Sequence, residues 1–179
     1  LFDLEEYCLV EKEVDAFFCY FMRQLCVDDQ DEHLKDTQYT QPSLYVVNSL
    51  HMFKAVIDGV QPTHVAGHSL GEYNALLAAG VFDFMTGLQL VKKRGELMAQ
   101  AKDGGMGAVI GLDRDQILAV IRDSGIAGID FANFNSPTQT VISGPIDEIT
   151  HAGQLLEQAG ARAYMPLQVS AAFHSRYMR

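Results

Sequence analysis

The sequence predicts an α/β fold built from two parts, and three observations support this prediction. An apolar pair, a Gly-x-Ser-x-Gly turn and a helix-forming run follow one another within residues 64–79. Apolar residues recur at helical spacing through much of residues 1–58. From residue 104 onward, short strand-like segments alternate with two helix-like segments. We therefore expect a larger part centred on a strand–turn–helix, followed by a smaller part with its own sheet.

Helices are expected to fill most of the larger part. Residues 1–36 should form an amphipathic helical region, and Ser43 should cap the next helix, which ends at Asp58-Gly59. Asp83 should cap a further helix that runs to Ala101. The apolar residues expected on the buried faces are Phe17, Phe18, Phe21, Met22, Leu25, Leu44, Val47, Leu50, Phe53, Leu88, Val91, Leu97 and Met98.

The Gly-x-Ser-x-Gly segment has the form of a sharp turn that presents a nucleophilic serine between a strand and a helix. Gly67 and Gly71 have no Cβ, so strand and helix can approach each other closely there. The backbone N–H of Leu70, at the helix N-terminus, is placed to stabilise the oxyanion of an acyl-transfer intermediate. We therefore predict that Ser69 is a nucleophile.

A capping box is the alternative explanation for part of this segment. Ser69 and Glu72 have the Ser-x-x-Glu spacing in which a serine caps a helix and a glutamate bonds back to it. That box does not explain Gly71 in the first helical turn, where glycine costs about 1 kcal/mol relative to alanine, and it does not call for Gly67. His68 is adjacent, but neighbouring side chains diverge on a strand or turn. We therefore expect a structural role for His68 and a catalytic base from elsewhere.

The smaller part is expected at residues 104–168. Its opening segment, Gly104 to Gly107, lacks the Gly-Lys-Ser/Thr ending of a phosphate-binding loop, so we interpret it as a hinge. Asp113 should cap its first helix, and Pro145 should open its second. The expected strands are residues 108–112, 129–133, 139–143 and 161–167, and the expected helices are residues 113–121 and 145–159. This strand–helix–strand–strand–helix–strand order is the ferredoxin-like motif.

Composition excludes several classes of protein. The 13 Lys and Arg residues against 23 Asp and Glu residues give a formal charge of −10, which argues against a general nucleic-acid binder. No stretch is long and apolar enough to span a membrane, and no signal-peptide pattern opens the chain. The three cysteines, Cys8, Cys19 and Cys26, fit neither a disulfide framework nor a zinc site. We expect a cytoplasmic protein that uses no metal.

Five segments, in this order, together resemble the malonyl-CoA:acyl carrier protein transacylases and the acyltransferase domains of polyketide synthases. The matching segments are Thr40-Gln41-Pro42, Gly67 to Tyr73, Val91 to Gly95, Asn133 to Pro137 and Ala172 to His174. The likeness is greatest to the free-standing acyltransferases that serve modules without their own. It implies an α/β hydrolase-like parallel-sheet domain at residues 1–103, a ferredoxin-like insert at 104–168 and a return to the large domain at 169–179.

The resemblance also implies roles for individual residues. Ser69 would form the acyl-enzyme, and His174 would act as its general base and then as general acid. Arg94 would bind the free carboxylate of the malonyl group, because its planar fork suits that group. The substrates would be malonyl-CoA and the phosphopantetheine thiol of an acyl carrier protein, with no cofactor. We expect His174 within hydrogen-bond reach of Ser69 Oγ.

Two expected family segments are not found. The family opens with a Gly-Gln-Gly-x-Gln strand and continues about 100 residues past the histidine, so we expect a chain truncated at both ends.

Three further functions stay open. The first, an acyl hydrolase on the same fold, has little use for Arg94. The second is a noncatalytic docking fragment, and the third is a Ser-Asp-His esterase. The esterase would take its acid from Asp130 or Asp147, which lie between Ser69 and His174.

Overall fold

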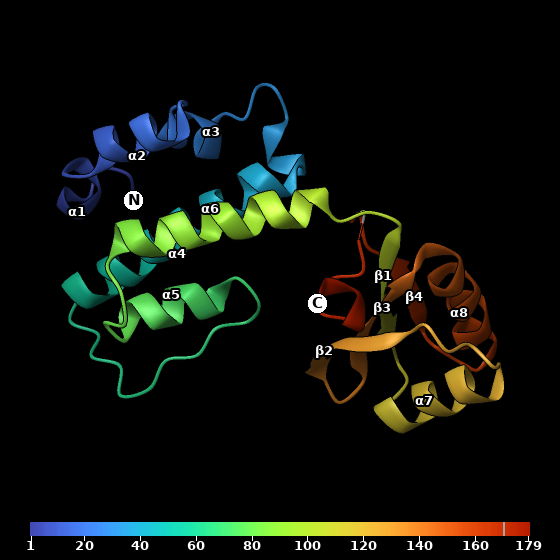
Figure 1. The fold of residues 1–179 in the computed structure, drawn as a ribbon. Helices are drawn as coiled ribbons and strands as arrows, with labels where there is room; N and C mark the ends of the chain where they lie inside the picture. Colours follow the sequence, from blue (N-terminus) through green and yellow to red (C-terminus); the bar gives the residue numbers. More distant parts are fainter. Residues whose placement is uncertain (170) are drawn as a thin grey trace. The chain divides into compact units, whose positions relative to one another are not determined.

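The chain divides into two compact units in the computed structural model, which describes residues 1–169 and 171–179. The first unit is Leu1–Ala99 and the second is Gln100–Arg179 (Figure 1). The first unit is helical, whereas the second contains a four-stranded sheet with two helices. The protein is therefore a mixed α/β structure, and each unit has its own core.

The first unit packs its helices around one apolar cluster. Its helices are α1 (Glu5–Cys8), α2 (Glu11–Phe18), α3 (Met22–Val27), the 3-10 helix η1 (His33–Lys35), α4 (Thr37–Ile57), α5 (Gly71–Ala78) and α6 (Phe84–Gln100). The core consists of Tyr7, Val14, Met22, Tyr45, Val46, Leu50, Leu70, Leu88 and Val91. Four of the residues expected inside, namely Met22, Leu50, Leu88 and Val91, are thus fully buried. No helix among the described residues is both long and apolar enough to cross a membrane.

The start of α4 and the exposure of three apolar residues differ from expectation. α4 begins six residues before Ser43, because Asp36 caps it by accepting a hydrogen bond from the Gln38 N–H at 3.1 Å. Phe21, expected inside, is 67% exposed. The reason is Cys19, whose left-handed backbone ends α2 and breaks the helical phase assumed across residues 1–36. Leu44 and Leu97 are likewise exposed. Asp83 does cap α6, by accepting a hydrogen bond from the Thr86 N–H at 2.7 Å.

The strand expected just before Ser69 is not formed. Residues 60–67 follow α4 without regular structure, and all eight are exposed. A strand needs a neighbour to receive its backbone hydrogen bonds, and residues 1–99, all of which are described, contain no other strand. The apolar Val65-Ala66 pair therefore runs as an irregular segment into the serine turn.

The second unit contains a four-stranded antiparallel sheet in the order β2-β3-β1-β4. Its elements are β1 (Gly104–Ile110), α7 (Arg114–Asp123), β2 (Asp130–Ser136), β3 (Gln139–Pro145), α8 (Ile146–Gln158), β4 (Ala163–Pro166) and the 3-10 helix η2 (Arg176–Met178). Side chains of α7 and α8 share one core with the two central strands, including Val109, Ile117, Ile142, Ile149 and Leu156. Asp113 and Gln116 form the capping box that starts α7, so the expected cap at Asp113 is confirmed.

The glycine-rich segment expected as a hinge is instead the buried first half of β1. A Cβ on Gly104 would lie 2.3 Å from the backbone nitrogen of Ala172, and one on Gly107 would lie 2.1 Å from the Tyr164 hydroxyl. Both distances are far inside van der Waals contact. These glycines therefore serve close packing, which the sequence alone does not distinguish from flexibility.

Candidate active site

Ser69 occupies a strained turn at the start of α5. Its φ of +52° lies in the left-handed region. Non-glycine residues adopt this region rarely, and those that do cluster at functional sites. A Cβ on Gly67 would lie 1.9 Å from the backbone carbon of Gly71, so only glycine fits at position 67. A Cβ on Gly71 itself would meet nothing within 4 Å, so the expectation that Gly71 is sterically required is wrong. The close approach within the turn therefore depends on Gly67.

The capping-box explanation of Ser69 is also wrong. The N-cap of α5 is Leu70, one residue after Ser69, and its side chain makes no cap hydrogen bond. The turn is closed by backbone hydrogen bonds, from the Gly71 N–H to the His68 carbonyl at 2.9 Å and from the Glu72 N–H to the Ser69 carbonyl at 3.2 Å. A capping box would need Ser69 at the N-cap, and the N-cap is instead one position later.

Arg94 reaches Ser69 from α6. Its Nη2 donates a hydrogen bond to Ser69 Oγ at 3.1 Å, and its Nη1 donates one to the side-chain oxygen of Gln41. The side chain is half-buried, and this burial lowers the pKa of Arg94. A guanidinium starts high enough to remain charged at neutral pH all the same. Arg94 is thus a partly desolvated cation beside a serine hydroxyl, whereas its neighbour Lys93 is exposed.

Gln41 is a site residue that sequence reasoning did not assign. It lies on α4, 53 residues before Arg94, and the two helices run alongside each other (Figure 1). A Cβ on Gly95 would lie 3.2 Å from the Thr37 carbonyl oxygen, so α4 and α6 touch closely at this point. This contact brings Gln41 to Arg94. The only signal in the sequence is the place of Gln41 in one of the matching segments.

His174 lies in the second unit, on the segment that follows β4. Its φ of +57° is again left-handed, and its side chain is exposed. The three residues before it, Ala171, Ala172 and Phe173, are buried. After it, the Ser175 hydroxyl donates a hydrogen bond to the Ala172 carbonyl at 2.5 Å. His174 therefore protrudes from a well-anchored turn, and its expected hydrogen bond to Ser69 stays a prediction.

The acids proposed for an esterase triad have surroundings of their own. Asp130 is paired with Arg176, whose hydrogen bonds lower the pKa of the Asp130 carboxyl. Asp147 is an exposed residue in the first turn of α8. The described residues contain no group of three or more His, Cys, Asp or Glu that would hold a metal ion. The engagement of Asp130 with Arg176 argues against the esterase.

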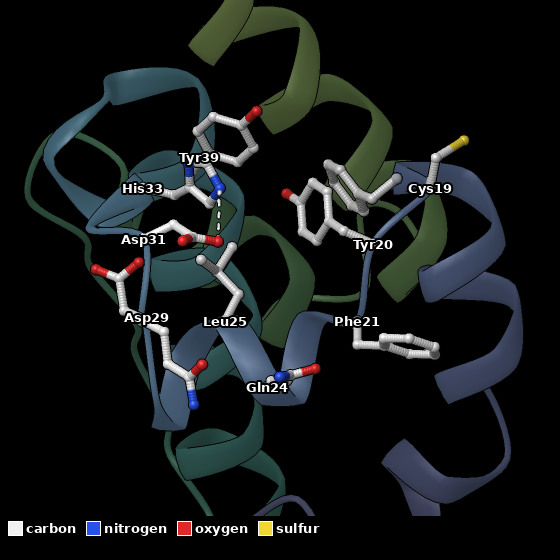
Figure 2. A pocket seen from close by; sticks show the side chains of 11 residues that line it. Cys19, Tyr20, Phe21, Gln24, Leu25, Asp29, Asp31, His33 and Tyr39 are labelled. Atoms are coloured by element: carbon white, nitrogen blue, oxygen red, sulfur yellow. Dashed lines mark ion pairs between the residues drawn. The ribbon is translucent and has the colours of Figure 1, made fainter.

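A cavity formed by other described residues does not contain this site. It has a volume of about 560 Å³ and lies in the first unit (Figure 2). Its walls include Tyr20, Phe21 and Tyr39, together with His33, which pairs with Asp31 at 3.8 Å. Ser69, Arg94 and Gln41 are not among its lining residues. This cavity is thus separate from the candidate site.

Comparisons with known proteins agree with the local chemistry. The family model for the acyl transferase domain matches residues 13–179. The chain is 50% identical over 180 residues to BaeC of Bacillus velezensis, a polyketide biosynthesis malonyl CoA-acyl carrier protein transacylase, covering 99% of this chain and 62% of that protein.

Two solved structures are also similar. One is a malonyl CoA-acyl carrier protein transacylase from Burkholderia pseudomallei, with a TM-score of 0.92, 48% identity, and coverage of 99% of this chain and 61% of that one. The other is a malonyl-transacylase in complex with its type II acyl-carrier protein, with a TM-score of 0.87, 34% identity, and coverage of 95% and 57%. The chain spans about three fifths of the length of these relatives. It belongs to the acyl transferase domain family.

Proposed function

We propose that the protein transfers a malonyl group from malonyl-CoA to the phosphopantetheine thiol of an acyl carrier protein, through an ester on Ser69. One observation carries the proposal, namely the Arg94 guanidinium 3.1 Å from Ser69 Oγ. A cation beside the nucleophile suits an acyl group that ends in a carboxylate, because Arg binds carboxylates with two parallel hydrogen bonds. The names of the similar proteins, malonyl CoA-acyl carrier protein transacylases, support this substrate.

The chemistry follows from the donors and acceptors of the serine. Ser69 Oγ accepts a hydrogen bond from Arg94, so its own O–H is the group that turns toward a base. In the proposed first step His174 takes this proton while Oγ attacks the thioester carbonyl. The Leu70 N–H, at the start of α5, stabilises the oxyanion. CoA then leaves as a thiol with the proton from His174, and a malonyl ester remains on Ser69.

The second step reverses the first with a different thiol. The carrier thiol gives its proton to His174 and attacks the ester carbonyl. When the tetrahedral intermediate collapses, Ser69 regains its proton from His174 and the malonyl group leaves as a thioester. These two steps need no cofactor, and Arg94 contacts the malonyl carboxylate in both of them.

We extend the proposal to the domain organisation and the location. Residues 104–168 form a ferredoxin-like insert in a hydrolase-like domain that includes residues 1–103 and 169–179. The antiparallel order β2-β3-β1-β4, with α7 and α8 on a common core, supports the insert. The proposed setting is the cytoplasm, where malonyl-CoA and carrier protein would be the partners.

Intact mass spectrometry tests the acyl-enzyme. The complete protein mixed with malonyl-CoA should gain one malonyl group, which Ser69→Ala abolishes and His174→Ala slows by several orders of magnitude. Release on adding a phosphopantetheinylated carrier protein should regenerate the original mass. The absence of an adduct on the wild type, or an adduct that persists in Ser69→Ala, contradicts the proposal and favours a noncatalytic fragment.

Selectivity for malonyl over acetyl groups separates the transferase from an acyl hydrolase. Loss of the carboxylate contact in Arg94→Ala should cost on the order of 2–5 kcal/mol, or about 30- to several-thousand-fold in malonyl loading. Acetyl loading from acetyl-CoA should hold or rise, because acetyl has no carboxylate. Lys93→Ala, next to it but exposed, is the matched control. An unchanged ratio of malonyl to acetyl loading would exclude Arg94 as the carboxylate contact and favour an acyl hydrolase.

A further inference from the structure

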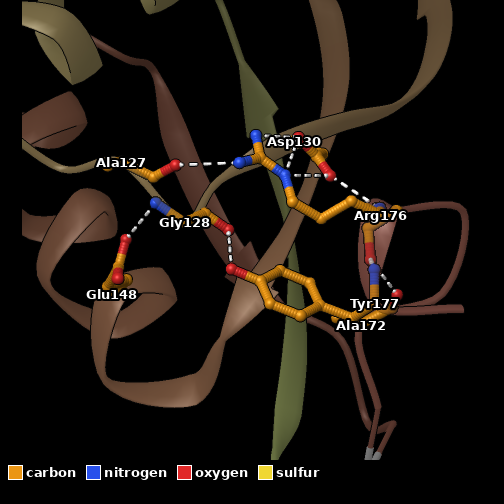
Figure 3. A network of polar contacts seen from close by, with 8 residues as sticks. Ala127, Gly128, Asp130, Glu148, Ala172, Arg176 and Tyr177 are labelled. Carbon is orange, nitrogen blue, oxygen red and sulfur yellow. Dashed lines mark hydrogen bonds and ion pairs between the residues drawn. The ribbon is translucent and has the colours of Figure 1, made fainter.

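A polar network fastens the chain just after His174 to the beginning of β2 (Figure 3). The Arg176 side chain donates from Nε to both oxygens of Asp130, each at 3.0 Å, and from Nη2 to Oδ1 at 2.5 Å. The backbone N–H of Arg176 also donates to Asp130 Oδ2, at 2.7 Å. One carboxylate thus holds both the main chain and the side chain of a residue two positions from His174.

Neighbouring contacts extend the network into the rest of the second unit (Figure 3). The Tyr177 hydroxyl donates to the Gly128 carbonyl at 3.1 Å, and the Gly128 N–H donates to a Glu148 oxygen on α8 at 2.7 Å. Arg176 Nη1 donates to the Ala127 carbonyl at 3.3 Å. The segment after His174 is therefore tied to β2, to the loop before it and to α8.

The segment before His174 is held by packing instead. Ala172 is 4% exposed, and its backbone nitrogen occupies the space that a Cβ on Gly104 would need. His174 lies between this buried segment and the Arg176 contacts, in a left-handed conformation. A strained backbone of this kind persists only where its surroundings over-determine it. Contacts on both sides of His174 supply that constraint.

Stability alone does not account for the Arg176–Asp130 pair. Its side chains are 52% and 22% exposed, and ion pairs that water reaches contribute little to stability because water and salt screen them. Two exposed ion pairs elsewhere, Arg122–Asp123 and Lys54–Asp58, have comparable distances of 2.9 and 2.7 Å but fasten no candidate catalytic residue. What distinguishes Arg176–Asp130 is its bond to the main chain next to His174.

We propose that Arg176 and Asp130 position His174 for proton transfer, as positioning residues that touch no substrate. The inference rests on the proposed role of His174 as the base. Removal of either partner frees one end of the turn, and the imidazole then samples orientations that do not reach the serine proton. A misplacement of about 1 Å is enough to slow a reaction on the order of 100-fold.

Kinetics of malonyl loading separate positioning from binding. Asp130→Asn and Arg176→Ala should lower kcat about 10- to 100-fold and leave KM for malonyl-CoA unchanged, since Arg94 is intact. Arg176→Lys should give an intermediate loss, because a lysine keeps the charge but not the fork. Arg122→Ala, which removes an exposed ion pair of the same unit, is the matched control and should have no effect. A higher KM with unchanged kcat overturns the proposal and makes the pair a substrate contact.

A double-mutant cycle tests whether the effect passes through His174. Asp130→Asn in a His174→Ala background should produce no further loss, because the group that it positions is already gone. A full additive loss overturns the proposal. Circular dichroism melts accompany each variant, and a variant that is less folded than Arg122→Ala is replaced by Arg176→Lys.

A spectroscopic readout keeps the inference separate from the proposed function. NMR follows the imidazole signals of the six histidines. The signal that disappears in His174→Ala is assigned to His174. That signal should shift or broaden in Asp130→Asn but not in Arg122→Ala. If wild-type protein forms no malonyl adduct, the proposed function fails, and the His174 signal still decides on positioning. An unchanged signal in Asp130→Asn overturns the proposal.

Discussion

The serine turn and the histidine turn share an unusual backbone but are held by different forces. Ser69 and His174 have φ values of +52° and +57°, both in the left-handed region. The serine turn depends on two backbone segments in direct contact, at Gly67 and Gly71. The histidine turn depends on buried residues before it and on polar side chains after it. Steric exclusion fixes the first, and hydrogen bonds fix much of the second.

This difference predicts how each turn responds to substitution. A steric contact tolerates no added atom, because overlapping backbone atoms have no rotamer with which to move aside. A hydrogen-bonded network loses its parts one at a time, and each loss is moderate where water can replace the partner. The serine turn should therefore fail abruptly, whereas the histidine turn should weaken in steps.

Gly67→Ala should have the largest effect. Its Cβ would lie 1.9 Å from the backbone carbon of Gly71, so the turn must open and malonyl loading should fall by about 100-fold or more. Gly71→Ala is the matched control, because a Cβ there meets open space. It should load normally and gain up to about 1 kcal/mol of helix stability. Equal damage from both substitutions would mean that sterics do not define the turn.

Gly104→Ala should have a smaller effect, on the packed side of the histidine turn. The new Cβ would lie 2.3 Å from the Ala172 nitrogen and should lower the free energy of unfolding by about 1–3 kcal/mol. Urea unfolding followed by circular dichroism measures this loss. In Gly105→Ala the nearest atom is instead the end of the flexible Ile146 side chain, so the loss should be less. The reverse order of the two variants would argue against a role for backbone packing here.

The smallest effect should be the pH dependence of the contribution that Asp130 makes to the free energy of unfolding. Arg176 lowers the pKa of this carboxyl in the folded protein below its ordinary value of 3.8. The pair therefore stabilises the fold above the unfolded pKa, and this contribution is lost as the pH falls through the lower, folded pKa. At pH 7 the free energy of unfolding of the wild type should exceed that of Asp130→Asn by at most about 1 kcal/mol. Urea unfolding at progressively more acidic pH should show this difference in free energy of unfolding becoming smaller. A difference that stays constant with pH would exclude the titration of Asp130 as its cause.

Local signals in the sequence are sufficient for much of the fold. Asp83 and Asp113 are short-range caps whose partners lie three residues away, and both are confirmed. The sharp turn at Ser69 is likewise encoded in five consecutive residues. Such features depend on neighbours along the chain, which sequence patterns describe directly.

Features that depend on distant partners escape prediction. Gln41 meets Arg94 through the packing of α4 on α6, and nothing in either segment alone places them together. Gly104 to Gly107 resemble a hinge because the sequence does not reveal Ala172 and Tyr164 packed against them. The apolar Val65-Ala66 pair favours a strand, but a strand also needs a partner that residues 1–99 do not provide.

The hydrogen bond from Arg94 to Ser69 gives one guanidinium two competing acceptors. An N–H donor that points at the serine hydroxyl cannot also complete a bidentate contact with a carboxylate. A malonyl tail would therefore draw the guanidinium away from Oγ as it docks, and the hydroxyl would become a better nucleophile at that moment. An acyl group without a carboxylate would meet a serine that is still restrained. Discrimination between acyl groups would then arise in the attack itself as well as in binding.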